Sequence, residues 1–157
     1  MADVNNNNVK VLGIVLIVFS AIGIISALFD LSIFNEMTDL FNRFGVDTSS
    51  FAASQTILII LKFFIAISII IFSVLFIRNK NIGRVGLILS LLTTTIYILF
   101  SPFLPSYEDL GPQPVPYDNS FEKMSFLYSY VFYIAISVGI YFIIKYLNKK
   151  ETKQLFN

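Results

Sequence analysis

The sequence predicts an all-α fold: an integral membrane four-helix bundle with both termini cytoplasmic and a short amphipathic helix in the first outer loop. Composition is the first reason, because hydrophobic residues make up 56% of the 157 residues and charged residues only 13%. Soluble domains carry about 25% charged residues. The second reason is a series of four apolar stretches, each close to the roughly 20 residues that a helix needs to cross a bilayer. The third is how charge is distributed around those stretches.

Charges sort onto two sides when the flanks of the four stretches are numbered alternately. One side takes eight basic residues: Lys10, Arg78, Lys80, Arg84, Lys145, Lys149, Lys150 and Lys153. The other takes eight acidic residues: Asp30, Glu36, Asp39, Asp47, Glu108, Asp109, Asp118 and Glu122. Lys and Arg collect on the cytoplasmic side of membrane proteins, so the pattern predicts a multi-pass protein of the cell membrane with cytoplasmic termini and acidic outer loops.

We expect one membrane domain over residues 1–157, because four spans and their loops use nearly the whole chain. The first apolar run is longer than a signal-peptide core and no A-x-A site follows it, so we expect it to be retained as a span. The spans are expected at about 11–29, 55–77, 83–100 and 125–146, the outer loops at 30–50 and 101–124, and the polar tails at 1–9 and 147–157.

Small residues in the first span predict close helix packing. Gly13, Gly23 and Ala27 recur along one side, and Gly23-x-x-x-Ala27 permits two backbones to approach closely. We interpret this as a seam within the molecule, with a homodimer face as the alternative. Asp30 is expected just beyond the outer end of this span, which leaves no carboxylate inside a span.

The first outer loop has a helical pattern. Phe34, Met37 and Phe44 recur at helical spacing opposite polar residues, and Gly45 follows them. This predicts an amphipathic helix of about three turns that lies in the outer membrane interface. Covering the mouth of the bundle or binding a partner are the alternatives.

The second and third spans are joined by the short basic turn 78–84, so they must be antiparallel neighbours. The third span carries small and hydroxyl residues within about a third of its circumference. These residues are Gly83, Gly86, Ser90, Thr93, Thr94 and Tyr97. They predict either a close helix contact, with Gly86 as a packing residue, or a polar lining.

All five prolines lie in the second outer loop, together with acidic and aromatic residues. The run from Pro112 to Pro116 favours a stiff polyproline II segment, which costs little entropy to order on binding. Pro112, Pro114, Pro116 and Tyr117 are therefore the candidate partner-binding residues, although a plain connector is the alternative.

The fourth span has tyrosines near both ends, as expected of an aromatic belt. Ala135-x-x-x-Gly139 supplies another small-residue seam. The tail after this span is basic, and we expect Lys149, Lys150 and Lys153 to lie against anionic headgroups.

Lys62 is the one basic residue that belongs to neither charged face, because it falls well inside a predicted span. It precedes Arg78 by 16 residues, or about 24 Å of helix, which puts it near the outer boundary. Gln55, Lys62 and Ser73 share the small and polar side of the helix, so Lys62 should point toward other helices. Its expected partners are Asp30, Asp118 or Glu122. The candidate intramembrane polar site consists of Lys62, Gln55, Ser73, Ser90, Thr94 and Tyr97. Lys62 has two interpretations: a structural ion pair, or a site that binds an anion, a lipid headgroup or a transported ion.

The chain has no Cys, His or Trp. It therefore lacks the Cys and His ligands of common metal and haem sites and the pairs that make Ser-His or Cys-His nucleophiles. No phosphate-binding loop, G-x-S-x-G or H-E-x-x-H motif is present. We expect no enzyme activity, no cofactor and no metal.

The leading hypothesis is a non-catalytic accessory or assembly subunit of a larger membrane protein complex. Its partners would be the lipid bilayer and membrane protein subunits, with no nucleic acid. The alternative is a small homo-oligomeric transporter or channel whose polar lining includes Lys62 and the third span. An intramembrane enzyme acting on lipid is a third, weaker hypothesis.

Overall fold

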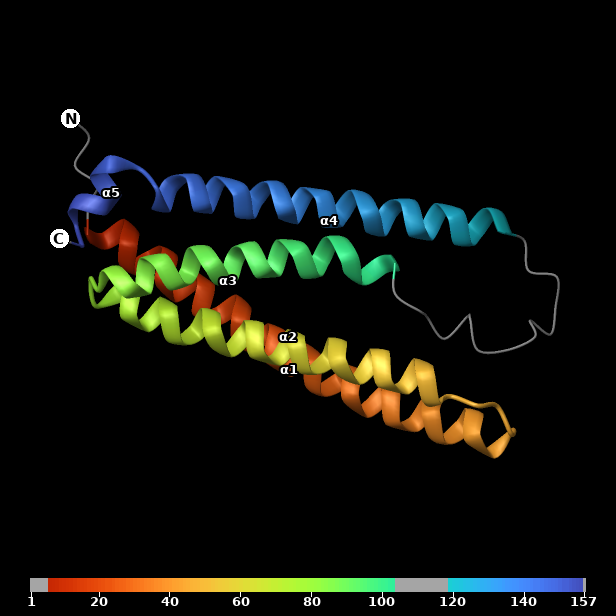
Figure 1. The fold of residues 1–157 in the computed structure, drawn as a ribbon. Coiled ribbons are helices and arrows are strands. Elements are labelled where there is room, and N and C mark those ends of the chain that lie inside the picture. The colour runs from red at the N-terminus through yellow and green to blue at the C-terminus, as the bar shows by residue number, and fades with distance from the viewer. Residues whose placement is uncertain (1–5, 104–118, 157) are drawn as a thin grey trace.

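The computed structural model describes residues 6–103 and 119–156, and their side chains except at 6, 50, 102 and 119–129. The described residues form helices joined by short turns (Figure 1). These helices are α1 (Asn6–Arg43), α2 (Ser49–Ile77), α3 (Asn81–Phe100), the 3₁₀ turn η1 (Ser101–Phe103), α4 (Asn119–Leu147) and α5 (Lys150–Gln154).

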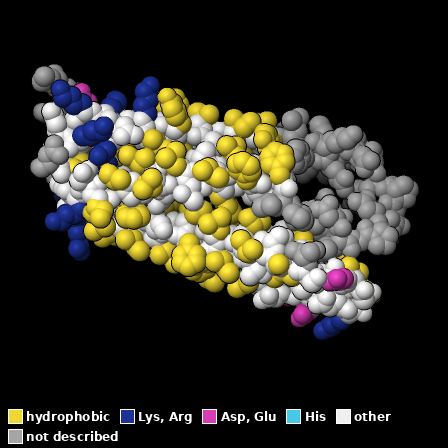
Figure 2. All heavy atoms as spheres, viewed as in Figure 1, with side chains coloured by type: hydrophobic (Ala, Val, Ile, Leu, Met, Phe, Trp, Pro, Cys, Tyr) yellow, Lys and Arg dark blue, Asp and Glu magenta, His cyan; other side chains and the backbone are white. Residues whose placement is uncertain are grey.

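Four of the described helices are long and apolar enough to cross a membrane. The prediction of an all-helical fold is confirmed, and the four helices support a multi-pass membrane protein. The apolar segments are Asn7–Arg43, Phe51–Ile77, Asn81–Phe100 and Tyr130–Leu147. Large apolar side chains are exposed along all four helices, as lipid contact requires. Figure 2 shows them as a band between an end rich in Lys and Arg and an end where carboxylates lie.

The helices pack in chain order. α1 lies along α2, α2 along α3 and α3 along α4, whereas α1 and α4 barely touch in the part of the chain described. In Figure 1 the α1–α2 pair diverges from α3 and α4 away from the end where α1 begins and α5 lies. The described helices therefore pack together at that end, here called the basic end, and spread apart at the other.

The first outer loop differs from its prediction. No separate amphipathic helix is present at residues 30–43, because α1 continues through them without a break. At 38 residues α1 is about 57 Å long, well beyond the roughly 30 Å of a hydrocarbon core. No Gly or Pro lies between Gly23 and Gly45, so no residue there favours a break before Gly45. Asp30 consequently lies within α1.

Gly45 ends α1 in a Schellman motif. Its φ is +73°, a conformation that glycine adopts without strain. Gly45 N–H donates to Asn42 O and Val46 N–H donates to Phe41 O, which satisfies two carbonyls of the last turn. The chain then reverses, and Phe34 packs against Phe51 of α2 with ring centroids 6.2 Å apart. The apolar side of the predicted loop helix is thus partly covered by α2.

The start of α2 depends on a carboxylate. Asp47 Oδ1 accepts a 2.9 Å hydrogen bond from the backbone N–H of Ser49, and this interaction lowers the pKa of Asp47 from its ordinary value of 3.8. A lowered pKa means that the ionised carboxylate stabilises the fold. That contribution is complete above the ordinary pKa and is lost as the pH falls through the lowered one.

We therefore expect Asp47→Ala to loosen the first turn of α2 at neutral pH. The amide of Ala52, which donates to Thr48 O, should exchange faster with deuterium in the variant than in the wild type. As the pH falls below about 4, the two rates should converge, because the wild-type carboxylate becomes protonated. Rates that differ equally at all pH values would contradict this role of the charge.

The turn between α2 and α3 is a second Schellman motif, with Asn79 at a φ of +54°. Asn79 N–H donates to Phe76 O, and Lys80 N–H donates to Leu75 O. The short turn brings Gly83 and Gly86 of α3 directly against α2. A Cβ on Gly83 would collide with the Leu75 and Phe76 backbone, and one on Gly86 would collide with the Phe72 ring.

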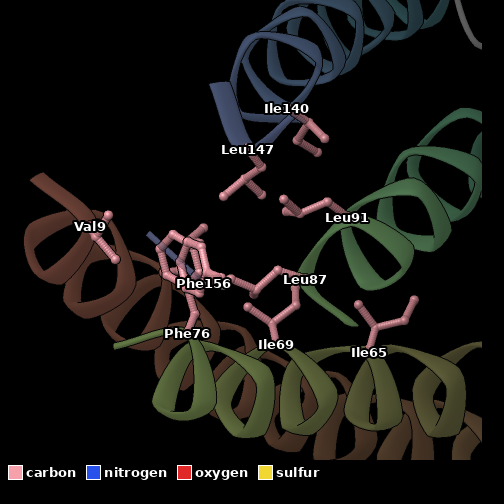
Figure 3. Close-up of a cluster of buried hydrophobic side chains, with 10 residues drawn as sticks. Val9, Ile65, Ile69, Phe76, Leu87, Leu91, Ile140, Leu147 and Phe156 are labelled. Carbon is pink, nitrogen blue, oxygen red and sulfur yellow. The ribbon is translucent and has the colours of Figure 1, made fainter. Parts of the chain in front are cut away.

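The main hydrophobic core lies toward the basic end (Figure 3). Phe76 of α2, Leu87 of α3 and Leu147 of α4 are fully buried there. Phe156, which follows α5, stacks on Phe76 with ring centroids 5.0 Å apart. The chain after α4 is therefore part of the core, whereas the sequence predicted only a polar tail.

Candidate functional site

Lys62 of α2 is bound to α1 by two contacts. Its Nζ lies 2.5 Å from Asp30 Oδ2 and donates a 2.9 Å hydrogen bond to Ser26 Oγ. Ser26 and Asp30 are four residues apart, so they lie one turn apart on the same side of α1. Of the three predicted partners, Lys62 therefore contacts Asp30. The side chains of the other two, Asp118 and Glu122, lie outside the described residues.

The ion pair is partly covered. The side chain of Lys62 is 25% exposed and that of Asp30 is 45% exposed. A lone charge in a span is costly, whereas a paired one presents the bilayer with a nearly neutral group. The pair also connects two helices that pack closely just below it, where Gly23 faces the Ala66 methyl group. The geometry is that of a structural clamp between α1 and α2.

A serine beside a lysine can be a nucleophile and its base, and here the geometry argues against that role. Lys62 Nζ donates hydrogen bonds both to Ser26 Oγ and to Asp30 Oδ2. An ammonium has three donors and no lone pair, so it cannot take a proton from Ser26. Lys62 therefore acts toward Ser26 as a hydrogen-bond donor.

Tyr97, another residue of the predicted polar site, lies on α3. Its side chain is half-buried against the main core.

Among the described residues, Ser73, Ser90 and Thr94 of the predicted polar site make no hydrogen bond to Lys62 or Asp30. Ser90 is buried, and its carbonyl accepts a 2.8 Å hydrogen bond from the Thr94 hydroxyl. The Thr93 and Thr95 hydroxyls bond in the same way to carbonyls one turn back. Ser73 is fully buried against α1, where its hydroxyl finds no partner in the described part of the chain. Gln55 is partly buried and has a partner of its own.

The predicted packing residues divide into two groups. Gly13, Gly23, Ala27 and Gly86 face neighbouring helices: an added Cβ on Gly13 would lie 2.5 Å from Ile77 Cγ1, and Ala27 is fully buried. Ala135 and Gly139 of α4 are exposed instead. No described atom lies within 4 Å of a Cβ built on Gly139. The seam on α4 therefore faces away from the described helices.

The candidate partner-binding residues Pro112, Pro114, Pro116 and Tyr117 lie outside the described residues. Their assignment stays a prediction from the sequence.

In comparisons with known proteins, no protein-family model, no curated protein and no solved structure matches the chain.

Three features of this structure were not predicted from the sequence. Ser26 was not predicted, although its position one turn before Asp30 was a usable signal. Arg84 is nearly buried, and its guanidinium donates to Asn81 Oδ1 and to Leu147 O at the end of α4. Thr152 and Phe156 are buried at the basic end, and their spacing of four residues in a basic tail was the only sign of an amphipathic turn.

Proposed function

We propose that this chain is a non-catalytic accessory or assembly subunit of a larger membrane protein complex, with α4 as the helix that contacts the partner. The observation that carries the proposal is the exposure of α4. Only 11% of the residues in its span are buried within the chain, against 22 to 28% in the apolar stretches of the other three long helices.

The exposed side of α4 has the pattern of a helix-packing surface. Val131, Ala135, Gly139 and Phe142 recur at helical spacing and are all exposed. Small residues in the middle of such a row let another helix approach closely, which is the main source of affinity between helices in lipid. The occupant that fits is therefore a transmembrane helix of another protein.

The polar groups of the bundle support the same proposal. Lys62 is paired with Asp30, and the threonine hydroxyls of α3 bond to their own helix. A small transporter or channel needs polar groups that are free to take up a substrate or ion. Lys62 and these hydroxyls are already paired within the described part of the chain, which favours the accessory role over that alternative.

The proposal includes the orientation, with both termini in the cytoplasm of a cell-membrane protein. Its support is the basic end, where α1 begins and α5 lies, together with the rule that Lys and Arg stay on the cytoplasmic side (Figure 2).

We expect Gly139→Leu to release the partner and leave the fold intact. A Cβ there has no described atom within 4 Å, and the bulk of a leucine would hold an approaching helix away from α4. The measurement is affinity purification of the tagged chain in mild detergent, with the co-purifying protein quantified by mass spectrometry. Melting temperature should change little.

The matched control is Ala21→Leu, a similar enlargement on an exposed position of α1. It should retain the partner. A wild-type chain that purifies alone, or associates only with itself, would refute the accessory role. A Gly139→Leu variant that keeps its partner would show that the partner does not bind this face of α4.

A further inference from the structure

The segment after α4 is folded back onto the bundle. We call residues 148–156 the C-terminal clasp. Thr152 is fully buried, and its hydroxyl donates a 2.9 Å hydrogen bond to Tyr146 O in the last turn of α4. Phe156 is 7% exposed and stacks on Phe76 of α2. Figure 3 shows it beside Phe76, with Val9 of α1 and Leu147 of α4 around them.

The end of α4 is also tied to α3. The Arg84 guanidinium donates to Leu147 O over 3.3 Å. A cation at a helix C-terminus is favoured by the helix dipole, and this one satisfies a carbonyl that the helix itself leaves unpaired. The clasp is therefore docked against ends of α1, α2 and α4, and α3 anchors the helix from which it emerges.

Docking gathers positive charge at the basic end. Seven basic residues are exposed there: Lys10, Arg78, Lys80, Lys145, Lys149, Lys150 and Lys153. Among the described residues of this end, the exposed acid is Glu151. Three of the lysines belong to the clasp, so closing it brings them toward the other four bases. Like charges held together repel, and a counter-anion relieves that repulsion.

We propose that the basic end binds the headgroups of anionic phospholipids, and that this binding stabilises the docked form of the clasp. The docked clasp presents its lysines as one preorganised surface, whereas an undocked tail must lose chain entropy to present them together. Each lysine near an anionic membrane surface contributes attraction. Because headgroups then bind the docked form better than the undocked one, they shift the equilibrium toward closure. The proposal is independent of any partner protein on α4.

The test is hydrogen exchange of the full-length protein in nanodiscs of pure phosphatidylcholine and in nanodiscs with a quarter phosphatidylglycerol. The informative amides are those of Lys153, Leu155 and Phe156, each of which donates a hydrogen bond within the clasp. We expect them to exchange about fivefold more slowly with the anionic lipid, the effect of roughly one lysine–headgroup attraction. Raising the salt concentration should shrink the difference, because the charges are exposed.

Two variants separate this effect from general electrostatics. Replacing Lys149, Lys150 and Lys153 together by glutamine should abolish the lipid dependence. The control Arg43→Gln removes an exposed base from the opposite end of α1. It should leave the lipid dependence of exchange unchanged. Phe156→Ala should speed exchange in both lipids, which checks that the readout reports docking. Equal exchange in the two lipids, or a lipid effect that survives the triple substitution, would overturn the proposal.

Discussion

Replacing Gly83 by alanine is expected to destabilise the bundle by about 1–3 kcal/mol or more, because the α2–α3 contact has no room for a methyl group. The added Cβ would overlap backbone atoms of Leu75 and Phe76. Backbone cannot rotate away as a side chain can, and the Schellman motif at Asn79 holds the two helices at a fixed distance. The helix propensity gained by removing a glycine, about 1 kcal/mol, opposes this loss without cancelling it.

The measurement is the melting temperature in detergent micelles, followed by circular dichroism. Gly86→Ala should cost less than Gly83→Ala, because the group it meets is the Phe72 ring, which can shift. Gly139→Ala is the matched control: it adds the same methyl group where no described atom is near, so it should be neutral or slightly stabilising. A Gly83→Ala variant with the melting temperature of the wild type would show that α2 and α3 move apart at little cost.

Lys62→Met is expected to destabilise the protein by about 1–3 kcal/mol, and Asp30→Leu by a similar amount. Removing one member of a fully buried ion pair costs roughly 3–5 kcal/mol, because the other charge is left unpaired. The cost here is lower since both side chains keep some exposure. Near the membrane boundary, the remaining charge can also reach toward water.

The double variant distinguishes a clamp from two independent residues. Lys62→Met combined with Asp30→Leu leaves no unpaired charge, so it should recover much of the stability lost by either single variant. Unfolding by sodium dodecyl sulfate, followed by circular dichroism, supplies the four free energies of the cycle. Ser26→Ala is the control, because it removes one acceptor and keeps the ion pair. Strictly additive losses would show that Lys62 and Asp30 do not stabilise each other.

Features that depend on local sequence were predictable. Four apolar stretches of span length became four long helices, because the hydropathy of a segment decides whether it can enter a bilayer and the bilayer then imposes helical hydrogen bonding. Lys62 was identifiable as an intramembrane charge that needs a partner, and Asp30 was among its predicted partners. The end of α1 at Gly45 also follows from local chemistry, since glycine adopts a positive φ without strain.

Other features were not predictable because they depend on contacts between distant segments. The amphipathic pattern of residues 30–43 fits a separate interfacial helix as well as it fits a continuation of α1. In the structure α1 continues through these residues, and Phe34 packs against Phe51 of α2. The seams at Gly23 and Gly139 look alike in sequence, yet one is turned toward α2 and the other faces outward. Which way a small-residue seam points depends on the rotation of its helix within the bundle.

The sequence by itself determined the membrane class, the helical content and the sorting of charge to two ends, because each follows from the transfer energies and charges of residues close together in the chain. Only the tertiary structure decided that Lys62 contacts Asp30 and Ser26, that Arg84 binds the end of α4 and that Phe156 completes the core. These pairings join residues separated by 32 to 80 positions. They are set by how the helices cross and rotate against one another, which hydropathy and periodicity do not specify.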